Sequence, residues 1–110
     1  MTKFETYLGK NDEHYFRLLN DKGDILLSSE GYTKKENLIN GINSVKTNIT
    51  DLKNFELKTA ANGKHFFNLK ATNGQVIGSS TMWDSPEIRD EWMKKLKTEV
   101  PAAEILETSK

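Results

Sequence analysis

The chain has 110 residues, 35% of them hydrophobic, and its 16 Lys and Arg residues balance 16 Asp and Glu residues. This length fits one compact domain, and a net charge of zero gives no overall attraction to nucleic acid or to an anionic membrane. The absence of cysteine excludes disulfides, a thiolate nucleophile and a cysteine-ligated zinc site. Neither a signal peptide nor an apolar run of roughly 20 residues is visible, so we expect a cytoplasmic protein without a membrane segment.

The same sequence is written twice in this chain. Residues 4–48 align without a gap to residues 55–99, 51 positions later, and 12 of the 45 pairs are identical. An internal period of this length indicates a duplicated supersecondary unit. We therefore interpret 1–110 as a single domain of two repeats, 4–48 and 55–99, with a short connection at 49–54 and a C-terminal tail at 101–110.

Each repeat begins with three short strands joined by turns. Alternating apolar residues predict the strands, since side chains two apart share a face. Lys22-Gly23, Asn62-Gly63 and Asn73-Gly74 are typical of tight hairpin turns, in which glycine supplies a positive φ. Three strands connected in this way form an antiparallel meander. The strands are expected at 4–8, 14–18 and 24–29, and again at 55–59, 65–69 and 75–80.

A helix closes each repeat. The segments TKKE at 33–36 and DSPE at 84–87 fit a capping box, with Thr33 and Asp84 as the N-caps. Apolar residues then recur at helical spacing. The predicted stripes are Leu38, Ile42, Val45 and Ile49 in the first helix, and Ile88, Trp92, Leu96 and Val100 in the second. For the tail at 101–110 the sequence leaves open whether it continues as a weak helix or frays.

The duplication has a physical reason. One repeat of about 50 residues buries only about 60% of its unfolded surface, so its stability would be marginal. Two repeats can share one core. The sequence therefore predicts an α+β fold in which two tandem β-β-β-α repeats form one antiparallel sheet, with both helices packed on one face and a pseudo-twofold axis between the halves.

These elements resemble the repeat of the YegP-like family of small uncharacterised bacterial proteins, across nearly the whole chain. The second repeat departs from the family pattern at 80–83 and at Trp92-Met93. The resemblance implies an α+β fold of β-β-β-α repeats and carries no established activity. The first repeat matches the pattern at Tyr15, Phe16, Leu18, Gly23, Ser29, Glu30, Tyr32, Gly41, Ile42, Ser44, Val45 and Lys46.

Catalytic candidates are few. His14 and His65 stand at one repeat position, without a nucleophile at a recognisable spacing. We interpret them as structural or solvated; a metal bridged by both is the alternative, and it needs a carboxylate. The pairs Ser28-Ser29 and Ser79-Ser80 lack a nucleophile elbow and fit a role in the turns that follow. We therefore expect no enzyme, no catalytic residue, no metal and no cofactor.

Strand alternation also predicts a surface on the sheet face opposite the helices. An uncovered strip of aromatic and basic residues fits contact with another protein or with a second copy of the chain. The alternatives are weak single-stranded nucleic-acid binding, in which rings stack on bases and cations meet phosphates, and ordinary surface. The zero net charge ranks nucleic acid second. The strip consists of Tyr15, Arg17, Leu19, Phe66, Asn68 and Lys70.

Overall fold

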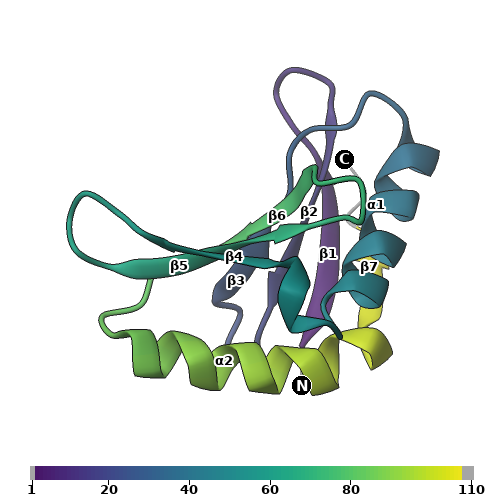
Figure 1. Cartoon of the computed structure of the whole chain (residues 1–110). Helices are drawn as coiled ribbons and strands as arrows, with labels where there is room; N and C mark the ends of the chain where they lie inside the picture. Colours follow the sequence, from purple (N-terminus) through teal and green to yellow (C-terminus); the bar gives the residue numbers. More distant parts are fainter. Residues whose placement is uncertain (1, 108–110) are drawn as a thin grey trace.

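The computed structural model describes residues 2–107, and these form one seven-stranded sheet with two α-helices (Figure 1). The predicted α+β class is confirmed. The order of strands across the sheet is β4-β5-β6-β3-β2-β1-β7. The elements are β1 (Lys3–Leu8), β2 (His14–Leu19), β3 (Ile25–Ser28), α1 (Lys35–Asn48), β4 (Phe55–Thr59), β5 (His65–Lys70), β6 (Val76–Ser80), α2 (Pro86–Glu99) and β7 (Glu104–Glu107), with 3-10 turns at Leu52–Asn54 and Val100–Ala102.

The two predicted meanders are present and pair in the same register. In the first, Phe4 of β1 lies opposite Leu18 of β2. In the second, the residues 51 positions later, Phe55 and Leu69, lie opposite each other. The meanders join where β3 pairs antiparallel with β6, and there Ser28 lies opposite its own repeat equivalent, Ser79. One sheet therefore runs through both repeats.

The tail contains a strand that the sequence analysis missed. Glu104–Glu107 forms β7, which runs parallel to β1 and covers its outer edge, so the sheet is mixed and not wholly antiparallel. The expectation of a helical or frayed tail is wrong for residues 104–107, whereas residues 101–102 lie in a 3-10 turn and residues 108–110 lie outside the described part. Helix α2 carries the chain from β6 to β7, which lies at the far side of the first meander, beside β1. Ile105 packs against the core from this strand.

A bulge in each meander changes which side chains reach the core. The β2–β3 pairing shifts after Leu18, which lies opposite Leu27, so that Leu19 lies opposite Ile25. The extra residue is Leu26, and a bulge lets two successive side chains point to the same side. Leu26 and Leu27 are accordingly both buried in the single hydrophobic cluster.

The helices contribute to this same cluster. The stripe predicted for α1 is confirmed, since all four of its residues are buried there. The stripe predicted for α2 is confirmed at Leu96 and Val100, which are buried, and wrong by one position in the first half of the helix. There Ile88 is exposed and Trp92 is only partly buried, while Arg89 and Met93 are buried. Trp92 instead packs at the edge of the core and stacks on Trp83, with ring centroids 6.4 Å apart.

The helix starts also differ from the capping boxes. Helix α1 has Lys34 at its N-cap, without a side-chain cap hydrogen bond. In α2 the N-cap is Ser85, one residue later than predicted, and its Oγ accepts a hydrogen bond from the Ile88 N–H at 3.2 Å. Both predicted caps, Thr33 and Asp84, are therefore wrong by one residue.

We expect Ser85→Ala to lower the free energy of unfolding by about 1 kcal/mol, because it leaves an N-terminal N–H of α2 without its acceptor. The matched change Thr33→Ala, before α1, should stay within about 0.5 kcal/mol of the wild type, as surface substitutions do. Urea unfolding of the two variants measures both numbers. Equal losses would argue against the assignment of Ser85 as the cap.

Candidate interaction surface

The predicted strip lies on the sheet but is divided between its halves. Tyr15 and Arg17 are on β2, and Phe66 and Lys70 are on β5. Strands β3 and β6 lie between them, so about 14 Å of sheet separates the two groups. The structure therefore presents two local clusters where the sequence analysis expected one strip.

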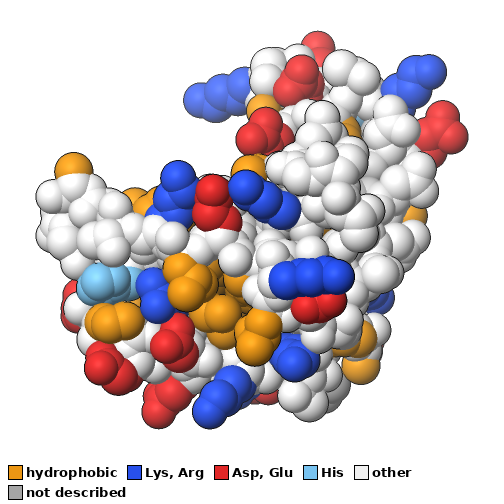
Figure 2. Space-filling view, viewed as in Figure 1, with side chains coloured by type: hydrophobic (Ala, Val, Ile, Leu, Met, Phe, Trp, Pro, Cys, Tyr) orange, Lys and Arg blue, Asp and Glu red, His pale blue; other side chains and the backbone are white. Residues whose placement is uncertain are grey.

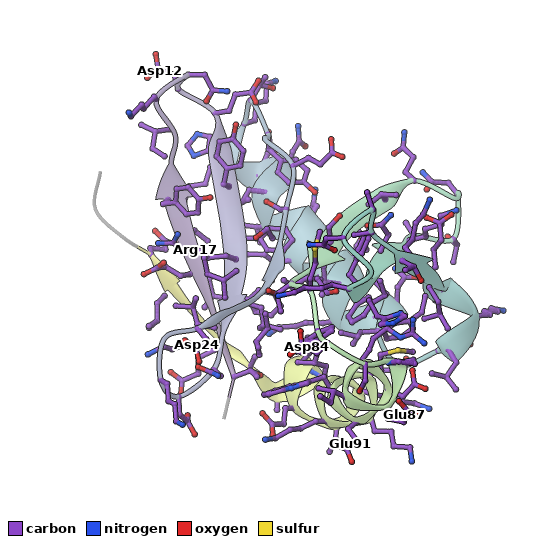
Figure 3. The ribbon with its side chains drawn as sticks, turned by 90° about the vertical axis from the view of Figure 1, so that its left-hand side faces the viewer. Asp12, Arg17, Asp24, Asp84, Glu87 and Glu91 are labelled. Carbon is purple, nitrogen blue, oxygen red and sulfur yellow. The ribbon has the colours of Figure 1, made fainter. Side chains whose placement is uncertain are left out.

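The first cluster is built on β1 and β2 and contains a tyrosine that the sequence analysis did not name. Tyr7 lies opposite Tyr15 in the β1–β2 register, and their rings stack with centroids 5.5 Å apart. The Arg17 guanidinium carbon lies 4.7 Å from the centre of the Tyr7 ring. Arg17 Nε also donates to Glu5 Oε1 at 2.6 Å. Figure 3 shows Arg17 beside these two strands, on the side away from α2.

Tyr15 is held in place from two directions. Its hydroxyl accepts a hydrogen bond from Asn11 Nδ2 at 3.0 Å. A Cβ atom at Gly9 would lie only 2.6 Å from Tyr15 Cε1, so the ring packs directly on the backbone there. Leu19, which the strip also includes, is only 8% exposed and offers little surface for contact. The accessible groups of this cluster are therefore the two tyrosines and the guanidinium.

The second cluster, on β4, β5 and β6, is polar. Glu56 Oε1 accepts a hydrogen bond from Asn68 Nδ2 at 3.2 Å, and its Oε2 lies 3.2 Å from Lys70 Nζ. The hydrogen bond from Asn68 has the larger effect and the contact with Lys70 the smaller, and together they hold the pKa of the Glu56 carboxyl below its usual value. Ser79 Oγ donates to Asn68 Oδ1 at 2.7 Å. Phe66, a partly buried aromatic residue, lies on β5 together with Asn68 and Lys70.

Both cations of the predicted strip have an anionic neighbour. Arg17 pairs with Glu5, and Lys70 pairs with Glu56, the repeat equivalent of Glu5. A phosphate that approached either cation would also meet a carboxylate within the same cluster. The chemistry of this face therefore favours aromatic and hydrogen-bonding contacts over the binding of a polyanion.

The two histidines occupy equivalent places in different halves. His14 forms an isolated bridge with Tyr32, and His65 forms one with Trp83. They open β2 and β5, which are about 14 Å apart in the sheet and run in opposite directions. The two histidines therefore lie at opposite ends of these strands, beyond the reach of one ion. Within residues 2–107, no group of three or more His, Cys, Asp or Glu side chains is placed to hold a metal ion.

Two repeat-equivalent serines, Ser29 just after β3 and Ser80 at the end of β6, form hydrogen bonds with the backbone. Ser29 Oγ accepts a hydrogen bond from the Phe16 N–H at 2.9 Å, and Ser80 Oγ accepts one from the Phe67 N–H at the same distance. Each hydroxyl also donates to the carbonyl of the next residue. Each hydroxyl therefore both accepts and donates a hydrogen bond within the strand-to-helix turn.

Among the described residues, neither α-helix is long and apolar enough to cross a membrane.

Known proteins are similar to this chain in sequence and in fold. The chain is 40% identical over 104 residues to a UPF0339 protein in the ptx operon 5' region of Stutzerimonas stutzeri, covering 94% of each chain. It is 41% identical over 92 residues to the UPF0339 protein YegP of Escherichia coli K12, covering 82% of this chain and 84% of YegP.

Two solution NMR structures resemble the whole molecule. That of E. coli YegP, a protein of unknown function, gives a TM-score of 0.89 at 34% identity, and covers 97% of this chain and 92% of YegP. That of a UPF0339 protein from Shewanella oneidensis gives 0.88 at 36% identity, with coverage of 96% and 90%.

The family match follows the repeats. Residues 10–56 and 60–107 each match the family described as "Domain of unknown function (DUF1508)". Each matched span begins before the second strand of a meander and ends in the strand that follows the helix. The first span ends in β4, and the second ends in β7. The resemblance inferred from the sequence is confirmed, and the chain belongs to the DUF1508 family, together with the UPF0339 proteins of the YegP type.

Proposed function

We propose that this protein is a non-enzymatic interaction module that binds another protein through the sheet face opposite the helices. The observation that carries the proposal is the cluster of Tyr7, Tyr15 and Arg17, whose side chains are already stacked and hydrogen-bonded. Rigid aromatic and guanidinium groups suit protein contacts, because little side-chain entropy is lost when they bind. The names of the relatives point to no enzymatic family.

Single-stranded nucleic acid is the second candidate ligand for this face. Stacking on Tyr15 or Phe66 would favour it, since bases stack on exposed rings. The pairing of Arg17 with Glu5 and of Lys70 with Glu56 weighs against it. The chain also has no net charge to attract a polyanion. Protein is therefore the better-supported ligand.

We also infer that a pseudo-twofold axis passes between β3 and β6, with both helices on the same side of the sheet. Three observations support it. The strand registers of the meanders agree at an offset of 51 residues, both meanders carry a bulge at the same place, and Ser28 pairs with its equivalent Ser79. The first cluster, with its tyrosines, and the polar second cluster would then lie on opposite sides of this axis.

Site-specific photo-crosslinking tests the proposed surface. A benzophenone amino acid is placed at Tyr15 or at Phe66 in the full-length protein inside bacterial cells, and at Ile88 on the outer side of α2 as a control. We expect discrete protein adducts from the two face positions and none from position 88. Adducts of twice the mass of this chain would identify a second copy as the partner.

Two results would overturn this proposal. Equal adducts from all three positions would mean nonspecific contact, and adducts that disappear on nuclease treatment would assign the face to nucleic acid. An added Arg17→Ala change separates the ligands further. A nucleic-acid complex should lose part of its salt dependence with this change, whereas a protein complex should weaken without that change in slope.

A further inference from the structure

The outer edge of β4 differs from the outer edge of β1. Both strands are the first of a meander, but β7 covers β1, whereas β4 ends the sheet. Among residues 2–107, no strand pairs with β4 except β5. An edge strand presents a row of backbone donors and acceptors to any strand that can reach it.

The hairpin that follows β4 fixes which backbone groups point outward. The Ala60 N–H donates to the Lys64 carbonyl at 2.8 Å. Because these groups alternate in direction along an antiparallel strand, every second residue before Ala60 also faces β5. The N–H and C=O groups of Phe55, Leu57 and Thr59 therefore face outward, toward the edge of the sheet.

An apolar groove runs beside this edge. It lies between β4 and α2, has a volume of about 360 Å³, and is lined by Leu52, Phe55, Leu57, Asp90, Met93 and Lys94. Leu57 is 52% exposed and Leu52 is 57% exposed. Figure 2 shows hydrophobic side chains gathered in this place. At the covered edge, the equivalent of Leu57 is Thr6, which is only 5% exposed, so the larger apolar residue stands on the uncovered strand.

The sequence of β4 is complementary to itself. In an antiparallel pair centred on Leu57, Glu56 of one copy lies opposite Lys58 of the other, and the same contact occurs twice. Leu57 then forms a hydrogen-bonded pair with its own equivalent, which matches the outward direction of its backbone groups. The side chains of the charged pairs approach most closely, since those residues form the pairs without backbone hydrogen bonds.

We propose that this protein forms a symmetric dimer in which β4 pairs antiparallel with β4 of a second copy, centred on Leu57. The two sheets then become one continuous sheet, and the helices of both copies lie on the same side. Leu52, Leu57 and Met93 of the two copies close the two grooves against each other. The backbone contact lies at the edge of β4, whereas the function proposed above is carried by Tyr7, Tyr15 and Arg17 on β1 and β2, so the two proposals can be tested separately.

Charge reversal in the full-length protein tests the dimer. Lys58→Glu places Glu opposite Glu twice, and Glu56→Lys places Lys opposite Lys twice. We expect each variant alone to have a dimer dissociation constant raised about tenfold or more. An equimolar mixture of the two should regain the wild-type affinity as a heterodimer, because both opposed pairs are then of opposite sign. Sedimentation equilibrium at rising concentration gives these constants.

The control is Lys22→Glu, the same charge change in the exposed turn between β2 and β3. It should leave the dimer unchanged, and circular dichroism should show that all variants are folded. A wild-type protein that stays monomeric at every concentration would overturn the proposal. So would a dimer that is indifferent to Lys58→Glu, or a mixture that fails to recover, because each result would exclude the β4 pairing.

Discussion

A fragment that ends at residue 53 should not exist as a folded monomer, although it contains a complete predicted repeat. In the whole molecule, α1 packs against β5 and β6 of the second repeat as well as against β2 of its own. The fragment would also lose β6 beside β3 and β7 beside β1. Three strands and a helix with two bare edges and half of the core form a marginal unit, because a chain of this size buries only about 60% of its unfolded surface.

The measurement compares the fragment 1–53 with the full chain. Far-UV circular dichroism and sedimentation should show the fragment either unfolded or associated as a homodimer that rebuilds the missing half. The full chain should unfold in one step, with the fluorescence of Trp83 and Trp92 following the same curve as the circular dichroism. Trp83 stacks on Trp92 and on Phe67, all in the second repeat, so the two tryptophans report on that half.

Two outcomes contradict this prediction. A fragment 1–53 that is monomeric and gives a cooperative melt would show that the first repeat has a sufficient core of its own. Separate fluorescence and circular dichroism transitions in the full chain would show two independent folding units. Either outcome would mean that Phe16 and Phe67, which lie in one buried cluster, belong to two cores that fold separately.

The six strands of the meanders could be predicted because two independent signals agree on them. Alternation gives the faces, and the offset of 51 residues repeats the same elements in the second half. Strand β7 has only four residues, Glu104–Glu107, directly after a proline-containing turn. Its pairing is with β1, almost a whole chain length away, and no local pattern encodes a contact of that range.

The error in α2 came from weighing hydrophobicity above the repeat. The stripe of α1 at the same offset falls on Arg89, Met93, Leu96 and Val100, and all four are buried. Arg89 concealed this pattern, since a buried arginine is rare unless it is paired. Its Nε lies 3.2 Å from Asp90 Oδ1. The repeat offset would have corrected the helix face where composition alone did not.

The candidate surface could be predicted in outline. Alternation placed Tyr15, Arg17, Phe66, Asn68 and Lys70 on the strands, but the sheet order that separates the halves depends on the β3–β6 contact. The pairing of Arg17 with Glu5 depends on the β1–β2 register, which the hairpin length sets. The basic character that strand alternation predicts for this face is therefore reduced by the carboxylates of Glu5 and Glu56, which lie next to the cations only in the folded sheet.

Exchanging one leucine and one glycine across the repeats should test how far the halves share a single core. Gly78 is the repeat equivalent of Leu27, and a Cβ atom at Gly78 would lie 3.1 Å from Leu27 Cγ and Cδ2. Leu27 is fully buried, so it already fills the space that a side chain at Gly78 would need. We expect Gly78→Leu to lower the free energy of unfolding by about 1–3 kcal/mol through overpacking, and Leu27→Gly by roughly 2–5 kcal/mol through the cavity that it leaves.

The double variant is the informative one. In Leu27→Gly/Gly78→Leu, the leucine enters the same space from β6 in place of β3, so the loss should be smaller than the sum of the single losses by roughly 0.5–3 kcal/mol. Urea midpoints at unchanged slope give the values. Gly78→Leu combined with Ile105→Ala, on the distant β7, is the control and should be additive. If the exchange is additive too, the two side chains do not compete for one space, and the equivalence of the halves at their junction is refuted.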